Sequence, residues 1–323
     1  MRRTLLIGAL ALSLSGCGMA PGLMNWSADA PTPSTPPASS SPSPSPSPTL
    51  ASPSPSATAT ATATPTPTPS ATSAGVTVSQ ARQALRQWVD KYNAMLTKRK
   101  WWRSNARLDA LFVEGALHEG VLERNHEDFG WKTGHKPIHP TGTPVIYLPR
   151  PEQQSPAGDW FIAQATYKDT EGHARPHVLG FIRSQGQPFR LAVATPVHWG
   201  QRIPKPLLDA DGYITDMDGA MARAVAEEYR NFWNGERKKE GDSGYRLARN
   251  SYSRKAFPKV NKGLYVGFAG HGSIFGFRTA DGGSFFLFAM INDPKSVNNV
   301  LSEALLVPKG SRTIQELGAD WFS

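Results

Sequence analysis

Three carboxylates of the sequence are candidates for general acid–base chemistry: Glu114, Glu119 and Asp159. A carboxylate at a pocket can donate or accept a proton during a reaction. The sequence does not show that any two of the three meet. We therefore assign no catalytic residue from it.

The segment Gly270-His271-Gly272-Ser273 is rich in glycine. A phosphate-binding loop and a serine-hydrolase elbow both require fixed glycine spacings at a strand-to-helix turn, and this segment has neither. We expect it to be the turn of a hairpin.

Histidine and aspartate pairs suggest metal binding but lack the required pattern. His135 and His139 lie in a stretch with Gly134, Pro137 and Pro140, and no third donor is evident. Zinc usually needs three or four ligands on fixed elements. The pair His118 and His126 is no better placed. The segments that begin at Asp209 and Asp216 lack the glycine and glutamate of a calcium loop and are interpreted as turns. We expect neither a metal nor another cofactor.

A basic run combines cations with indole rings, and it comprises Lys98, Arg99, Lys100, Trp101, Trp102 and Arg103, with Arg107 close behind. Cations and indoles together suit anionic polymers or lipid headgroups. The alternative is a solvated helix end whose lysines complement the helix dipole, with both tryptophans folded onto the core. Charge runs are commonly solvated faces, which favours the alternative.

Four aromatic residues are candidates to line a concave pocket: Trp88, Tyr92, Phe112 and Trp160. A small ligand could sit among them. Plain core packing would use the same residues.

The elements that must position these residues follow from hydrophobic periodicity. Steps of three and four predict helices over 81–96, 108–117 and 221–232, with Ser79 placed to cap the first. Short apolar runs between turn residues predict strands at 145–148, 160–163, 177–182, 189–194, 264–268, 274–278 and 285–290. The predicted fold is α+β, with helices and antiparallel sheets.

One hairpin pattern occurs twice at an offset of 96 residues. Leu179, Gly180 and Phe181, with Gly186, Phe189 and Leu191, match Phe275, Gly276 and Phe277, with Gly282, Phe285 and Leu287. Any two hairpins share turn glycines and alternating apolar residues, so chance is an alternative. With the preceding helices, the pattern favours two tandem units, 76–203 and 219–323, joined by a connector at 204–218.

The N-terminus has the form of an export signal, with Arg2 and Arg3 before an apolar run of ten residues that is too short to span a bilayer. The following Leu14-Ser15-Gly16-Cys17 resembles the lipobox of bacterial lipoproteins. The resemblance implies cleavage after residue 16 and a diacylglycerol anchor on Cys17. Cys17 is the single cysteine of the chain, so no disulfide is expected.

Residues 17–75 are predicted to be an anchor and stalk. From Ala30 to Gly75 there is no charged residue, and Pro, Ser, Thr and Ala dominate. Such a stretch cannot form a core, and its prolines favour an extended conformation.

The folded region carries nearly all the charge. Without Arg2, Arg3 and Asp29, the 35 basic and 26 acidic residues become 33 and 25. Anionic or neutral partners are therefore expected. Export argues against nucleic acid. The membrane through the lipid anchor, a cell-wall polymer or an envelope protein are the partners that we expect.

Several short motifs together resemble an uncharacterised family of actinobacterial surface lipoproteins whose domain has no assigned function. They are Tyr92-Asn93, Val113-Glu114-Gly115, Trp160-Phe161, Asp211-Gly212 and the run from Arg278 to Gly283. The resemblance implies two NTF2-like or cystatin-like units, each a long helix packed on a curved sheet. It implies no catalytic residues.

Three hypotheses of function follow. The first is a membrane-anchored extracytoplasmic protein whose folded region is a non-catalytic binding or scaffolding module. The second is an enzyme that acts on a small molecule or wall component in an NTF2-like pocket, although fold alone cannot argue that. The third is an accessory subunit of a membrane complex.

Overall fold

The first helix of the described residues has a complete N-terminal cap. In this computed structural model the described residues are 75–128, 135–153, 158–168, 172–184, 186–260, 267–292 and 299–322. The predicted signal peptide, Cys17 and all of the predicted stalk except Gly75 lie outside them. Helix α1 (Val78–Leu96) starts after Thr77, whose side chain accepts a hydrogen bond from the Gln80 backbone while the Gln80 side chain accepts one from Thr77. The cap is therefore Thr77, two residues before the predicted Ser79.

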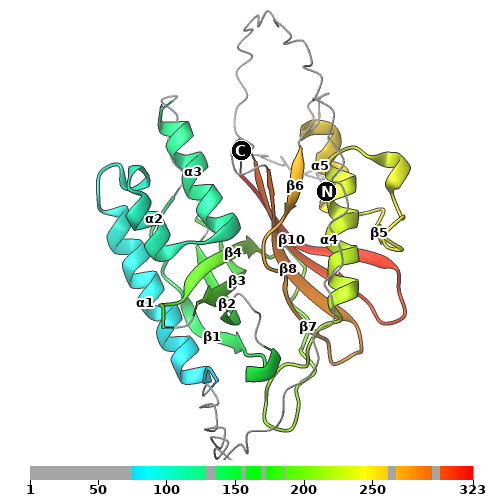
Figure 1. The fold of residues 1–323 in the computed structure, drawn as a ribbon, viewed down its shortest axis with the longest axis horizontal. Coiled ribbons are helices and arrows are strands. Elements are labelled where there is room, and N and C mark those ends of the chain that lie inside the picture. Colours follow the sequence, from blue (N-terminus) through cyan, green and yellow to red (C-terminus); the bar gives the residue numbers. More distant parts are fainter. Residues whose placement is uncertain are drawn as a thin grey trace, which may run out of the picture. The chain divides into compact units, whose positions relative to one another are not determined.

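The predicted second helix is two helices. After the 3-10 turn η1 (Trp101–Arg103), α2 (Asn105–Leu111) ends at Phe112, and α3 (Glu114–Asp128) begins after Val113. Glu114 has a left-handed φ of 53°. This sharp break turns α3 away from α2 (Figure 1).

The first sheet is antiparallel with strand order β1-β2-β3-β4. Its strands are β1 (Thr141–Tyr147), β2 (Asp159–Lys168), β3 (Ala174–Arg183) and β4 (Arg190–Pro196), with a 3-10 turn η2 (Pro151–Gln153) after β1. One face of this sheet packs on α1, η1 and α2. Phe161 and Phe181, which are paired across β2 and β3, lie fully buried in that core.

The second sheet has the order β5-β10-β9-β8-β6, and β7 also pairs with β8. Its strands are β5 (Arg246–Leu247), β6 (Phe268–His271), β7 (Phe275–Arg278), β8 (Ser284–Asn292), β9 (Val300–Val307) and β10 (Thr313–Phe322). One face is covered by α4 (Gly219–Trp233) and α5 (Tyr252–Val260), and a short turn η3 (Arg237–Lys239) lies between α4 and β5. All pairings are antiparallel except that of β5 with β10. The last strand, β10, is an interior strand of this sheet, so both β9 and β10 are part of its framework.

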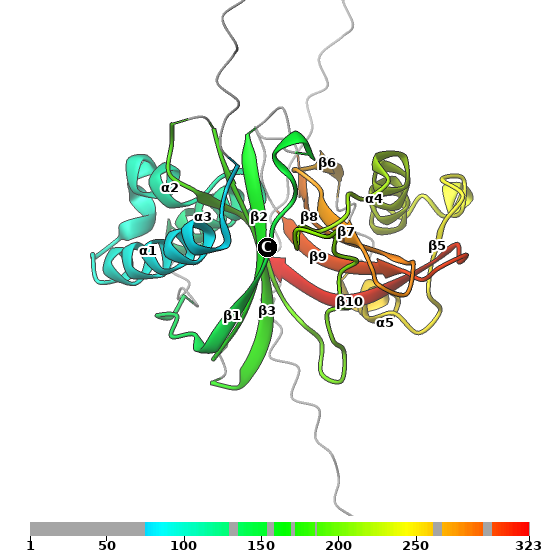
Figure 2. The ribbon, with the colours of Figure 1, turned by 90° about the horizontal axis from the view of Figure 1, so that it is seen from below.

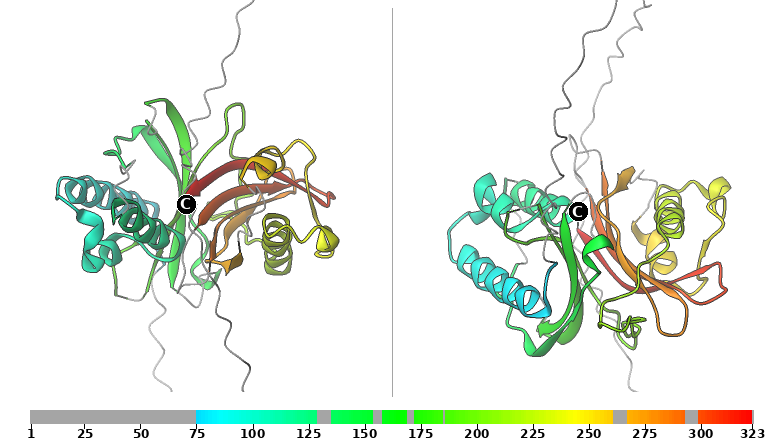
Figure 3. Two further views of the ribbon diagram at one scale, coloured as in Figure 1. Left: turned by 90° about the horizontal axis from the view of Figure 1, so that it is seen from above. Right: turned by 60° about the horizontal axis from the view of Figure 1, so that its bottom comes forward.

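The two sheets pack against each other, with α1 and α2 outside the first sheet and α4 and α5 outside the second (Figures 2 and 3). Helix α3 contacts strands of both sheets. Trp160 from β2 meets Phe275 from β7 edge to face in the core between the sheets. Gly180 permits this approach, because a Cβ there would lie 2.8 Å from the Phe275 ring. Burial of aromatic surface in this layer joins both halves of the folded region.

The mixed α+β architecture with antiparallel sheets is confirmed, and α1 and α4 match the predicted helices. Both predicted hairpins are present, but their equivalent positions face different layers. Phe181 and Leu191 face the helices on the first sheet, whereas Phe277 and Leu287 face the opposite sheet. The 96-residue match therefore reflects the alternation shared by hairpins.

The prediction of a hairpin turn at residues 270–273 is wrong. Strands β6 and β7 both pair with β8, at successive positions along it, so they are one interrupted strand. The interruption at Gly272 and Ser273 receives the carboxylate of Glu114, the first residue of α3. Glycine leaves room for this contact, because a Cβ on Gly272 would lie 2.7 Å from that carboxylate.

The predicted connector packs across the folded region. Isolated bridges join Pro206 to Thr279 and Pro149 to Ile214. Residues 68–323 accordingly form one compact unit. No helix among the described residues has the length and apolar character needed to cross a bilayer.

Candidate functional site

Helix α3 brings carboxylates against the second sheet. Gly115, in its first turn, lies so close to β8 that an added Cβ would be 2.3 Å from the Cβ of Ala289. The same helix also packs on β4 and β9. Glu119 and Glu123 lie one helical turn apart on α3, so both project toward the region where the two sheets meet.

Glu123 belongs to a chain of three polar side chains. Its Oε1 atom lies 2.8 Å from Nε2 of His135, and the Nδ1 atom of His135 lies 2.9 Å from the hydroxyl of Tyr92. The Glu123 side chain is completely buried. Burial, with the charges of Glu119 and Glu123 adding to it, raises the pKa of Tyr92.

Glu119 faces the ends of β9 and β10. The hydroxyl of Ser302 donates a hydrogen bond of 3.3 Å to Oε1 of Glu119. Ser302 and Asp320 are paired across β9 and β10, so they lie on the same face of the sheet. Burial raises the pKa of Glu119 to about 8, with the charges of Asp320 and Glu123 adding to the rise and the bond from Ser302 opposing it. Glu119 is therefore mainly protonated at neutral pH.

Asp320 lies at the water-exposed side of the same group of residues. Desolvation by the surrounding protein raises its pKa, and the nearby Arg175 and His135 oppose that rise. Tyr167 lies close enough for the charges of Asp320 and Glu119 to raise the pKa of its buried hydroxyl, after the larger effect of desolvation. We call these residues the α3–β10 cluster: Tyr92, Glu119, Glu123, His135, Tyr167, Arg175, Ser302 and Asp320.

Aromatic rings border this cluster. The ring of His135 meets Trp101 edge to face at 5.1 Å and lies 6.2 Å from Phe322. Phe322 is half-buried and stacks on His126 at 5.2 Å.

A second buried network lies on the opposite face of β9 and β10. The hydroxyl of Tyr229 donates to Oε2 of Glu316 at 2.6 Å, the backbone of Ser253 donates to the same oxygen at 3.0 Å, and Nε2 of His198 lies 2.9 Å from Oε1. Burial acts to raise the pKa of Glu316, but these hydrogen bonds hold it below its ordinary value.

Glu303 behaves in the opposite way within this network. Burial, followed by the charge of Glu316, raises the pKa of Glu303 well above its ordinary value. The network therefore holds, on neighbouring strands, two carboxyls whose pKa values are shifted in opposite directions.

The three predicted acid–base carboxylates have different roles. Only Glu119 lies in a titratable cluster. Glu114 accepts hydrogen bonds from the backbone and hydroxyl of Ser273, at 2.7 and 2.6 Å, and so ties α3 to the second sheet. Asp159 accepts two hydrogen bonds from the guanidinium of Arg183.

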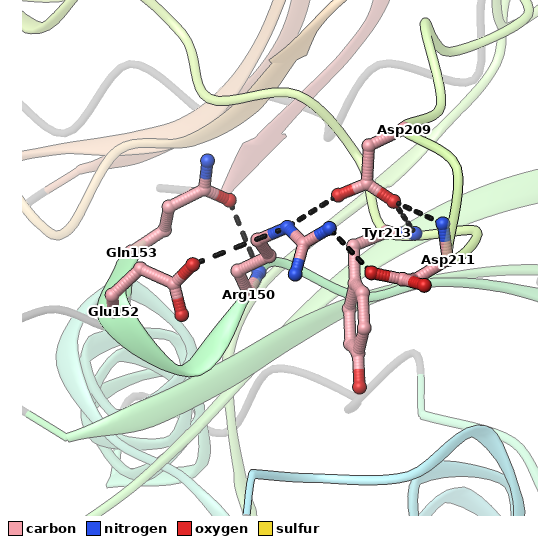
Figure 4. A network of polar contacts seen from close by, with 6 residues as sticks. All are labelled: Arg150, Glu152, Gln153, Asp209, Asp211 and Tyr213. Atoms are coloured by element: carbon pink, nitrogen blue, oxygen red, sulfur yellow. Dashed lines mark hydrogen bonds and ion pairs between the residues drawn. The ribbon is translucent and has the colours of Figure 1, made fainter.

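The segment that begins at Asp209 forms a turn, as predicted, whereas the segment that begins at Asp216 leads into α4, with Asp218 as its N-cap. Asp209 accepts hydrogen bonds from the backbone of Asp211 and Tyr213 (Figure 4). Arg150 closes the turn through contacts of 2.6 Å to Asp209 and 2.7 Å to Asp211. The carboxylates of Asp209 and Asp211 are thus paired with the guanidinium of Arg150.

The two members of each predicted histidine pair lie in different environments. His135 is part of the α3–β10 cluster, whereas His139 is exposed. Desolvation lowers the pKa of half-buried His118, and His126 stacks on Phe322. Among the residues that the structure describes, no group of three histidine, cysteine, aspartate or glutamate side chains could hold a metal ion.

The basic run divides into a buried and an exposed part. Trp101 and Trp102 are buried in the first core and contact each other edge to face. Arg124 on α3 donates to the Trp102 carbonyl oxygen, which fixes the turn. The five cations are all exposed, and we call them the basic segment: Lys98, Arg99, Lys100, Arg103 and Arg107. The indoles thus serve the core, as the alternative interpretation holds, while the cations face water.

Only three of the four predicted pocket residues lie together. Trp88 stacks on Tyr92 at 5.2 Å, and Phe112 meets both rings edge to face. Trp160 lies in the other core, between the sheets. The three rings are buried in close contact, and a shallow depression of 250 Å³ between α1 and α2 reaches the edge of Trp88.

A larger depression of 390 Å³ lies beside the start of α4. The β9–β10 turn contributes Lys309 and Arg312, and Arg312 lies over the Tyr245 ring at 5.1 Å. Neither depression adjoins the α3–β10 cluster.

The chain matches one protein family over most of its folded region. Residues 73–309 match the family described as Domain of unknown function (DUF8094). The chain belongs to this family. Comparison with curated proteins and with solved structures gave no match.

The sequence revealed Glu119 as a candidate but not the cluster around it. Tyr92 and His135 are 43 positions apart, and Glu119 and Ser302 are 183 apart. A one-turn spacing of Glu119 and Glu123 on a helix was the only local signal.

Proposed function

We propose that the chain is a lipid-anchored protein at the extracytoplasmic face of the cell membrane, and that its folded region is a non-catalytic module that binds an anionic envelope polymer. The observation that carries the binding proposal is the basic segment. Its five exposed cations lie within ten residues of each other, four of them on the turn fixed by two buried tryptophans and Arg107 on the adjoining α2. A rigid mount lowers the conformational entropy lost on binding.

Most of these cations have no internal partner. Lys98, Arg99, Lys100 and Arg107 form no ion pair with any residue that the structure describes. Two arginines elsewhere on the surface are neutralised by carboxylates, Arg150 by Asp209 and Arg183 by Asp159. The positive charges of these four side chains are therefore available to a partner.

A polymer suits this arrangement better than a single small anion. The cations are spread along an exposed turn, and neither depression of the surface described above includes them. Several weak contacts to successive anionic groups can act together through release of counterions. The affinity would then fall steeply with salt.

The anchor and stalk complete the proposal. The lipobox-like segment that ends at Cys17 would tether the chain, and the uncharged stalk would hold the folded region away from the bilayer. We infer that each half of the folded region is an NTF2-like or cystatin-like unit of an actinobacterial surface lipoprotein. Support for the fold comes from the helix-covered, largely antiparallel sheet in each half, and support for the class of protein comes from the lipobox-like segment.

Retention on purified cell wall tests the binding proposal. The full chain would be applied at low salt and eluted by a gradient from roughly 20 to 500 mM NaCl, a range over which screening becomes strong. Lys98→Gln, Arg99→Gln and Lys100→Gln together should lower the elution salt clearly. A matched variant removes three exposed cations elsewhere, at Arg249, Lys255 and Lys309, and should elute like the wild type.

Equal elution of the two triple variants would show that net charge alone acts and would refute a specific role of the basic segment. No retention of the wild type at the lowest salt would refute polymer binding. The tether has its own test, because Cys17→Ala should release the protein from membranes into the soluble fraction.

A further inference from the structure

The α3–β10 cluster joins residues from α1, α3, both sheets and the segment that contains His135. Three of its members are carboxyl groups, at Glu119, Glu123 and Asp320, and two are bases, at His135 and Arg175. Ionisation of all three carboxyls would leave an excess of negative charge in a place largely shielded from water.

An unpartnered oxygen points to a missing partner. The Glu123 side chain is fully buried, and its ion pair with His135 involves Oε1. Among the residues that the structure describes, neither Glu123 oxygen has a hydrogen bond of good geometry, and Oε2 has no ion pair. A buried polar atom left this way costs free energy, so its retention suggests a functional use.

Water reaches the cluster from one side. Asp320 is exposed, Glu119 is half-buried, and His135 keeps about a fifth of its side chain accessible. A small group could therefore meet Glu119 and Asp320 without unfolding the core. The half-buried ring of Phe322 lies beside this entrance.

We propose that the α3–β10 cluster is a binding site for the primary ammonium group of a small ligand, held between the carboxylates of Glu119 and Asp320. The hydroxyl of Ser302, already bonded to Glu119, is a further acceptor for the N–H groups. The aromatic ring of Phe322 favours a cation next to it.

Charge selects this ligand class. An anion would be repelled by the ionised carboxyls of the cluster, and a neutral alcohol would not relieve their mutual repulsion. A positive charge can replace the proton that Glu119 otherwise holds, so binding at neutral pH would release that proton. The inference is independent of the polymer proposal, because the two sites have opposite charge and lie on different residues.

The test uses n-butylammonium chloride and the full chain. Calorimetry at pH 7 in two buffers with different ionisation enthalpies measures both affinity and proton release. We expect saturable binding with release of on the order of one proton per site, and no binding of neutral n-butanol at a concentration roughly tenfold higher. Tetramethylammonium, which has no N–H donor, should bind more weakly.

Glu119→Gln mimics the protonated side chain and keeps its shape. It should abolish the proton release and weaken butylammonium binding by about tenfold or more, because a charge-assisted contact is lost. Asp320→Asn changes an exposed position and should weaken binding similarly. It is the test variant if Glu119→Gln fails to fold. The matched control is Glu152→Gln, which removes an exposed carboxylate elsewhere and should leave binding unchanged.

Three results would overturn the inference. They are equal affinity of wild type, Glu119→Gln and Asp320→Asn, persistent proton release in Glu119→Gln, and binding of n-butanol as tight as that of butylammonium. Loss of wall retention with intact butylammonium binding would reject only the polymer proposal, and the reverse result would reject only this one.

Discussion

Replacement of Glu119 by glutamine should make the folded region more stable, and increasingly so as the pH rises. Glutamine has the shape of the protonated acid and can keep the contact with Ser302. Burial and the charges of Asp320 and Glu123 disfavour the ionised form of the Glu119 side chain, and glutamine cannot ionise. The variant therefore isolates the cost of ionising one side chain.

The direction follows from proton linkage. The pKa of Glu119 is about 8 in the folded chain, against an ordinary value of 4.5. Below about pH 4.5 the carboxyl of residue 119 is protonated in both the folded and the unfolded chain, so the wild type and the glutamine variant should have similar free energies of unfolding. Between 4.5 and about 8 the unfolded chain has lost its proton while the folded chain still holds it, so the stability of the wild type falls as the pH rises. Above about 8 the difference is constant.

The magnitude is a few kcal/mol. One pKa unit corresponds to about 1.36 kcal/mol, so the interval from 4.5 to about 8 sets an upper bound of about 5 kcal/mol. Glu119 is only half-buried, and screening by solvent reduces this to about 2–3 kcal/mol. For a domain of this size the midpoint of thermal unfolding should differ by about 5–10 °C at high pH.

The assay is thermal and urea unfolding of both proteins at a series of pH values from about 4.5 to 8.5. The two curves should nearly coincide at the acid end and separate steadily toward the alkaline end. Glu152→Gln, which removes an exposed carboxylate, should follow the wild type throughout. A difference between wild type and Glu119→Gln that stays constant with pH, or that favours the wild type at pH 8.5, would refute the reasoning.

Two further predictions concern packing and the second polar network. Gly115→Ala should destabilise the fold by about 1–2 kcal/mol in urea unfolding, because its Cβ would lie 2.3 Å from the Cβ of Ala289, whereas Gly270→Ala, with open space around it, should change stability by less than about 0.5 kcal/mol. If both variants unfold alike, the close contact between α3 and β8 is not as described. Tyr229→Phe should cost about 1–3 kcal/mol, since it removes the 2.6 Å hydrogen bond to the buried carboxylate of Glu316. An unchanged urea midpoint would show that this hydrogen bond does not stabilise the fold.

The sequence predicted the fold class because hydrophobic periodicity is a local property. The apolar stripes of α1 and α4 recur at helical spacing, and the β-branched and aromatic runs alternate as strands do. Periodicity failed where a short break mattered. Phe112 and Val113 interrupt a helical pattern without a proline or a turn signal, and Gly272 interrupts a strand that continues beyond it.

Pairing between distant segments was beyond local signals. The hairpin pattern around Phe181 and that around Phe277 are alike in sequence, yet one faces helices and the other faces a sheet. Which face of a strand is covered depends on what packs there, and alternation alone does not tell the two faces apart. For the same reason, the sequence did not reveal that Trp160 and Trp88 lie in different cores.

The sequence by itself determined the charge of the folded region, the exposed cations at residues 98–107, the helices with strong apolar stripes and the features that favour a lipid anchor at Cys17. These depend on composition and short-range order. Only the tertiary structure decided that Glu119 meets Ser302 and Asp320, that Glu114 is a clamp, and that the two sheets share a core. The physical reason is that the pKa of a group depends on all the charges near it and on how far the surrounding protein excludes water. Here the residues responsible come from segments up to about 200 residues apart in the chain.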